Sequence, residues 1–208
     1  MESERRSPLA ARLAVLRNPS VRVILPVTVL GMAAAYTAYA YAIPAFAAVG
    51  VSSDATQWTL FLYGVGAIVG AQSSGGLTDR FGGTRVLIAG YAVMVGTLAA
   101  FGSLSLAGVA LPVLVGVLAF TWGASSWCQT PPQQHRLIAA ASEEAPLVIA
   151  LNSSSIYIGI GVGTFIGGLA GAGSAAWMFF SGAVIAVLAA GFLIATSRVA
   201  EGPGAHTA

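Results

Sequence analysis

Few side chains in this sequence could carry out acid–base, nucleophilic or metal chemistry, and nearly all of them stand between its apolar segments. Those closest to an apolar segment are Asp54, Asp79, Glu143, Glu144 and His135. Inside the apolar segments stands one thiol, Cys128, which as the single cysteine can form no intramolecular disulfide. The sequence has no metal-ligand spacing, no nucleophile with a neighbouring base and no phosphate-cradling loop. We therefore expect no catalytic residue, no metal and no cofactor, and the sequence argues against an enzyme.

The charged residues, only 8% of the chain against 57% hydrophobic residues, are absent from four long stretches. These stretches are 23–53, 55–78, 86–134 and 145–197. A helix on the surface of a soluble protein turns one face to water and carries charge there, so helices that are apolar all round require a lipid solvent. The sequence thus predicts an integral membrane protein of all-α class. Its formal net charge of +2 is too small to suggest a nucleic-acid partner.

Six segments are long enough to cross a bilayer, which takes about 20 helical residues. They are predicted at residues 23–48, 57–77, 86–104, 109–130, 147–170 and 175–196. Together they form a transmembrane domain over 23–197, between a leader at 1–22 and a tail at 198–208. The leader has short apolar pieces interrupted by arginine and no small-residue cleavage site, which is unlike a secretory signal.

The nine arginines predict the orientation of these spans, since basic residues favour the cytoplasmic side of a membrane. They are Arg5, Arg6, Arg12, Arg17, Arg22, Arg80, Arg85, Arg136 and Arg198. With six spans all nine fall on one side, and the other side carries only Asp54. We expect a multi-pass protein of the cell membrane with both termini in the cytoplasm.

Polar side chains are unevenly shared among the six segments. The first, second, fourth and fifth carry several hydroxyl, amide and phenol groups, whereas the third and sixth are plain. Polar groups are costly in lipid and should face a partner helix or a wet cavity. Two polar segments followed by one apolar segment, repeated once along the chain, indicate a 3+3 inverted repeat, which is typical of secondary transporters. The alternative is that the plain helices are simply the outermost ones of a bundle.

Glycine recurs at four-residue spacing in two of the polar segments. The positions are Gly66 and Gly70 in the second segment, and Gly159, Gly163 and Gly167 in the fifth. Small residues on one helix face let two backbones approach closely, which provides packing energy where lipid offers no hydrophobic drive. We expect these glycines to be helix-packing positions.

The stretch GGLTDRFGGTR, between the second and third segments, resembles the loop signature of the major facilitator superfamily. The matching positions are Gly75, Leu77, Asp79, Arg80 and Gly82, and Arg85 supplies a trailing basic residue. Gly83 and Thr84 depart from the pattern, where members often carry a basic residue. The resemblance implies a gating loop, formed by Gly75, Asp79, Arg80, Gly82 and Arg85, that latches the cytoplasmic side. The alternative is that Asp79 and Arg80 anchor helix ends at the membrane interface.

A helix N-terminus would favour an acidic partner such as Asp79 by up to about 1 kcal/mol. ASEEAP predicts such a terminus at the start of the fifth segment. Ser142 would be its cap and Pro146 would lie in its first turn.

The resemblance extends over residues 16–197 and is closest to the second six-helix half of drug and sugar efflux permeases of the arabinose type. It rests on LRNPSVRVILPVTVLGMAAAYTAYAYAIP and on PPQQHRLIAAASEEAPLVIALNSSSIYIGIGVGTFIGG. It implies that the first, second, fourth and fifth segments line a central cavity and that the third and sixth face lipid. The candidate substrate-binding residues are then Tyr36, Tyr39, Tyr63, Trp122, Asn152 and Tyr157. Such side chains suit a neutral amphipathic solute, although each could equally serve helix packing or an interfacial aromatic belt.

These features lead to a functional hypothesis with one alternative. The chain would transport a small molecule by alternating access, together with a second six-helix half that is either another copy or a separate chain. No carboxylate or histidine lies within a predicted span, so a titrating group for proton coupling would belong to that second half. The alternative is a non-transporting remnant or an accessory membrane subunit.

Overall fold

The computed structural model describes residues 14–201, and helices dominate that part of the chain. The α-helices are α2 (Pro19–Tyr39), α3 (Ala42–Ala47), α4 (Ser53–Phe81), α5 (Gly83–Ala107), α6 (Pro112–Trp127), α7 (Thr130–Ala140), α8 (Ala145–Gly171) and α9 (Ala175–Glu201). Two 3-10 turns, η1 (Ala14–Arg17) and η2 (Ser142–Glu144), precede α2 and α8. Residues 14–201 contain no strand, which confirms the all-α prediction.

Five helices are long and apolar enough to cross a membrane: α2, α4, α5, α8 and α9. They confirm the prediction of a multi-pass membrane protein. The fourth predicted segment, 109–130, corresponds to α6, which has 16 residues. At 1.5 Å per residue α6 rises about 24 Å, less than the roughly 30 Å of a hydrocarbon core.

α6 ends early because two prolines follow it. Pro131 and Pro132 have no amide hydrogen to donate, and the first turn of a helix is where proline costs least. The chain therefore makes a turn at Cys128 and Gln129 and starts α7 at Thr130. α7 lies where the sequence analysis placed a connector, and it buries Gln133, Arg136 and Leu137.

The first predicted segment is also interrupted. α2 ends at Tyr39, and the short α3 follows from Ala42. The ring of Pro44 would collide with the carbonyl group of Ala40 if the helix continued, so the break falls one turn before this proline.

The stretch predicted as a loop between α4 and α5 is helical at all but one position. α4 runs to Phe81, α5 starts at Gly83, and Gly82 alone turns the chain with a φ of 83°. This conformation is open to glycine and disfavoured for other residues. Asp79 and Arg80 therefore belong to the last turn of α4 rather than to a loop.

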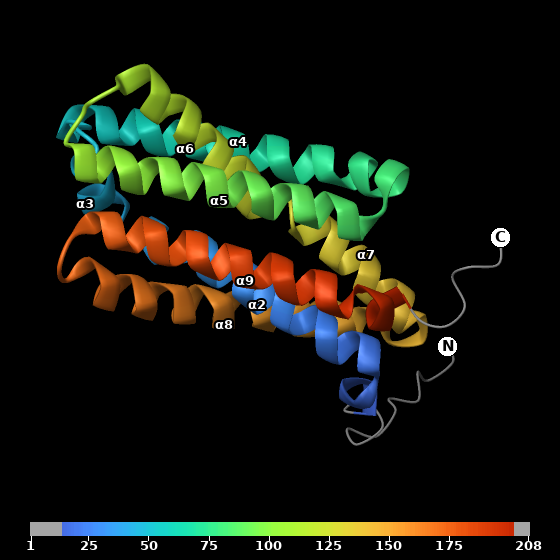
Figure 1. The fold of residues 1–208 in the computed structure, drawn as a ribbon. Coiled ribbons are helices and arrows are strands. Elements are labelled where there is room, and N and C mark those ends of the chain that lie inside the picture. The colour runs from blue at the N-terminus through green and yellow to red at the C-terminus, as the bar shows by residue number, and fades with distance from the viewer. Residues whose placement is uncertain (1–13, 202–208) are drawn as a thin grey trace, which may run out of the picture.

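The helices form two groups that meet along α5 and α9 (Figure 1). In one group α4 packs on α6, and α6 contacts α5; in the other, α2 packs on both α8 and α9. The α4–α5 turn, α7 and the start of α2 lie at one end of the bundle, and α3 lies at the opposite end (Figure 1). The first end therefore carries Arg80, Arg85 and Arg136.

Glycine allows the closest helix contacts in both groups. A methyl group added at Gly66 or Gly70 of α4 would overlap the backbone of α6 at Phe120 or Ala124. On α8, Gly159, Gly163 and Gly167 each lie as tightly against the backbone of α2. The two pairs of helices are thus held at a separation that any side chain at these positions would increase.

Candidate substrate-binding site

Four of the six candidate binding residues form one aromatic cluster. Tyr36 and Tyr39, three residues apart on one face of α2, meet edge to face with their ring centroids 5.1 Å apart. The Tyr39 ring stacks on Tyr63 of α4 at 4.5 Å. Trp122 of α6 presents an edge to both, at 6.0 Å from Tyr39 and 5.3 Å from Tyr63. Three helices that are distant in sequence therefore contribute to the cluster, which offers apolar faces with a few polar atoms.

Trp122 is the innermost member of this cluster. Its ring is fully buried against Phe46, Phe101 and Phe179, with centroids 6.2, 5.7 and 6.1 Å away. The indole Nε1–H has no hydrogen-bond partner among the residues that the structure describes. A buried donor normally has a partner, so this one would be satisfied only if a water or a polar atom of a bound molecule reached it.

Asn152 lies apart from the aromatic cluster, in the interface between α8 and α2. It is fully buried, and its Oδ1 accepts a hydrogen bond of 2.9 Å from the hydroxyl group of Thr28. Thr28 in turn accepts one of 3.0 Å from Gln133 Nε2, and Arg136 Nη1 donates to Gln133 Oε1 at 2.8 Å. The structure thus joins α8, α2 and α7 through a buried polar network.

This network was missed in the sequence because its α7 members were assigned to a connector. The spacing of Gln129, Gln133 and Arg136 was the available signal, since residues three and four apart share one helix face. Gln129 lies on the same side, where its Oε1 accepts a bond of 3.1 Å from the hydroxyl group of Tyr91.

Tyr157, the sixth candidate, lies on α8 with 73% of its surface exposed. It is close enough to interact electrostatically with Tyr36, a half-buried member of the aromatic cluster. The exposed face of α8 that carries Tyr157 also carries Ser153 and Ser154, whose hydroxyl groups donate to carbonyl groups of their own helix.

The predicted gating residues gather around the α4–α5 turn. Asp79, Arg80 and Arg85 are exposed there, and the Arg80 guanidinium lies 5.0 Å from the centroid of the Phe81 ring. The α8 N-terminus differs from its prediction, because the cap position is Glu144 rather than Ser142 and forms no side-chain capping bond. Pro146 does lie in the first turn of α8, as predicted.

Long apolar helices around a buried aromatic cluster define the class of this molecule, a multi-pass helical membrane protein. The model of the Major Facilitator Superfamily matches residues 24–207, and the chain belongs to this family. Its members are in general transporters rather than enzymes.

Two curated relatives illustrate the match. The chain is 26% identical over 185 residues to the uncharacterised MFS-type transporter YfhI of Bacillus subtilis, covering 88% of this chain and 45% of that protein. It is 28% identical over 193 residues to the inner membrane transport protein YdhP of Escherichia coli, covering 88% of this chain and 47% of that protein. The chain therefore spans about half the length of the curated relatives it matches.

Proposed function

We propose that this chain contributes one six-helix half of a small-molecule transporter that works by alternating access with a second half. The observation that carries the proposal is the incomplete burial of α4 and α8. Only 22% of the spanning stretch of each is buried, against 61% for α2. Their exposed faces carry Gln72 on α4 and Tyr157 on α8. Such side chains are poorly suited to lipid and call for a covering partner or a wet cavity.

The helix contacts support a 3+3 inverted repeat, in which the short helix α6 is the fourth of six crossings. Exchanging the triplet α2, α4, α5 with the triplet α6, α8, α9 converts the α2–α8 contact into α6–α4. The same exchange converts α2–α9 into α6–α5 and leaves α5–α9 unchanged. All five contacts are present. Secondary transporters built from such repeats bind substrate near the repeat interface.

The arginine-bearing end of the bundle is proposed to face the cytoplasm, with both termini on that side. The α4–α5 turn and α7 lie there (Figure 1), and these elements carry Arg80, Arg85 and Arg136. Asp79, exposed at this turn, is then available to the N-terminus of a helix in the second half. Such a contact would latch the cytoplasmic side when closed.

The substrate is proposed to be a neutral amphipathic molecule bound against Tyr39, Tyr63 and Trp122, with further contacts to Tyr36 and Tyr157. Aromatic faces take its apolar part, and the buried indole N–H takes a polar atom. Export follows from the resemblance to efflux permeases. Across the part of α2, α4, α5, α6, α8 and α9 that the structure describes, no histidine lies in a spanning segment and the carboxylates stand at helix ends. A proton-coupling carboxylate is therefore assigned to the second half.

Native mass measurement in a mild detergent tests the pairing. A half-transporter should give a complex of two copies, or of this chain with a separate six-helix chain, and cells expressing it should export a neutral amphipathic dye. Monomers alone, with no export, would favour the remnant or accessory-subunit alternative. If the complex contains a separate six-helix chain, dye export is measured in cells that express both chains.

A further inference from the structure

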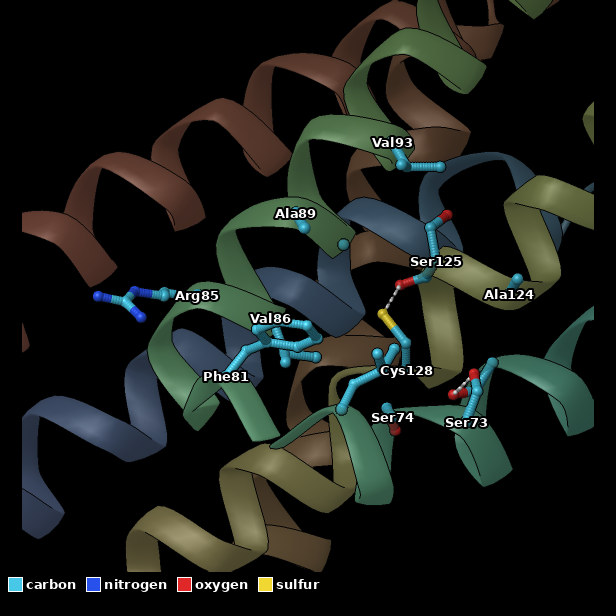
Figure 2. A pocket seen from close by; sticks show the side chains of 13 residues that line it. Ser73, Ser74, Phe81, Arg85, Val86, Ala89, Val93, Ala124, Ser125 and Cys128 are labelled. Atoms are coloured by element: carbon cyan, nitrogen blue, oxygen red, sulfur yellow. Dashed lines mark hydrogen bonds between the residues drawn. The ribbon is translucent and has the colours of Figure 1, made fainter. Parts of the chain in front are cut away.

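A cavity lies between α4 and α5, and its lining includes no member of the aromatic cluster. It has a volume of about 420 Å³, within the range of ligand-binding cavities. Ala124 and Ser125 of α6 and Cys128 of the turn after it close its inner side (Figure 2). The cavity exists because α4 packs chiefly on α6 and α5 chiefly on α9, which leaves a fissure between α4 and α5.

The wall of this fissure offers a bound molecule almost no free hydrogen-bond donor. Its hydroxyl groups already donate to carbonyl groups of their own helices: Ser73 to Val69 at 2.7 Å, and Ser74 to Ala71 at 3.0 Å. The Cys128 thiol donates likewise to the Ser125 carbonyl group at 3.3 Å (Figure 2). A polar solute entering here would lose its hydrogen bonds to water and find few donors, so an apolar chain is the suitable guest.

The fissure opens sideways into the bilayer region. Leu77, Phe81 and Val93 line it and are 42%, 45% and 48% exposed, on helices that cross the membrane. An acyl chain of the surrounding lipid can therefore enter without passing through water.

The rim at the arginine-bearing end is cationic. Arg85 lines the cavity there, and its guanidinium extends outward, apart from the other lining side chains (Figure 2). Arg80 lies over the ring of Phe81, a second lining residue. Asp79 is the acidic residue of the same turn, which leaves an excess of one positive charge among the three. The N-cap residue of α5 is Gly82, which forms no side-chain capping bond, and the helix N-terminus adds to the attraction for an anion.

From this arrangement we infer that the α4–α5 fissure binds an anionic phospholipid, with one acyl chain in the cavity and the phosphate group at Arg85. The inference needs the membrane-spanning fold but not transport. The lipid would support the α4–α5 turn from the membrane side and would couple the position of this turn to the charge of the surrounding lipid.

The binding test uses the whole chain in mild detergent, titrated with phosphatidylglycerol or phosphatidylcholine and weighed by native mass spectrometry. We expect one retained phosphatidylglycerol. Ala89→Phe, which fills the cavity, should abolish retention, whereas Ala92→Phe, an exposed site on the same helix outside the cavity, should not. Arg85→Gln should weaken phosphatidylglycerol binding about fivefold, the factor expected from one arginine at an anionic head group. Phosphatidylcholine, whose phosphate charge is balanced by its choline, should bind more weakly at the outset and lose less. Arg198→Gln, an exposed arginine elsewhere, is its matched control.

Cys128 then locates the lipid, since it is the single cysteine and lines the cavity. Phosphatidylglycerol should slow alkylation of Cys128 by N-ethylmaleimide in the wild type and in Ala92→Phe. Retention of lipid by Ala89→Phe at the wild-type level would overturn the inference. So would unprotected Cys128 in the lipid-bound protein, equal affinity for the two lipids, or protection that follows dimerisation instead of lipid. Thermal unfolding of each variant verifies that it is folded.

Discussion

Thr28 on α2 donates a hydrogen bond of 2.9 Å to the Asn152 side chain on α8, although 124 residues separate the two in the chain. Both side chains are buried, and Gln133 of α7 extends the contact to a third helix. A hydrogen bond inside an apolar bundle aligns these helices more specifically than apolar packing alone. If the helices shifted, the hydroxyl and amide groups would lose this bond with no water nearby to replace it. The bond gives the first prediction.

Thr28→Val should lower the stability of the folded bundle, since it keeps the side-chain shape but leaves Asn152 Oδ1 and Gln133 Nε2 short of a partner. The loss should be about 1 kcal/mol, typical of interhelical hydrogen bonds in membranes. Thermal unfolding in detergent measures it. Ser153→Ala, on the exposed face of α8, is the control and should change little. Equal effects of the two substitutions would contradict the network.

Gly163→Ala should be destabilising because a Cβ there overlaps the backbone of Ala33 on α2. Overpacking of this kind costs roughly 1–3 kcal/mol. Gly161→Ala is the matched control, two residues away with open space around it. Alanine is the better helix former, so this control should be neutral or slightly stabilising in the same melting experiment. A fall in melting temperature with Gly161→Ala as large as with Gly163→Ala would show that packing on α2 is not the cause.

Trp122→Phe should reduce export of the substrate, because it removes the buried indole N–H while keeping an aromatic ring. The expected loss of apparent affinity is about tenfold, corresponding to one hydrogen bond of about 1.4 kcal/mol. The measurement is dye export at a series of dye concentrations. Trp177→Phe, at a side chain that is 56% exposed, serves as the control. An unchanged apparent affinity of Trp122→Phe for the dye would show that the substrate does not accept a hydrogen bond from Nε1.

Asp79→Asn should impair transport without affecting folding, if Asp79 latches the second half. The residue is exposed at the end of α4, so the substitution leaves the bundle core intact. A lost charge–dipole contact of about 1 kcal/mol would reduce the closed population about fivefold. Crosslinking between the cytoplasmic ends of the two halves reports that population. Asp54→Asn, at the opposite end of α4, is the comparison, and an equal effect there would argue against a latch at Asp79.

The interruptions of the helices were only partly predictable. The predicted segments 23–48 and 109–130 included no break at a proline, and proline alone does not decide one, because α2 continues through Pro26 but ends before Pro44. Whether the chain then continues as helix is decided by contacts, and α7 forms because Gln133, Arg136 and Leu137 become buried against neighbouring helices. A loop was expected between the second and third segments, whereas the structure turns the chain at Gly82 alone.

The apolar segments, their approximate ends and the membrane environment follow from the sequence alone, since the transfer of a side chain into lipid depends mainly on that side chain. The choice of helix partners does not, because it depends on the fit of surfaces that lie far apart in the chain. Tyr39, Tyr63 and Trp122 could be named as polar-tipped aromatics in three segments, but their stacking required the packing of α4 on α6 beside α2. Likewise Asn152 was a candidate for substrate contact from its type, and only its partner Thr28 assigned it to the interface of two helices.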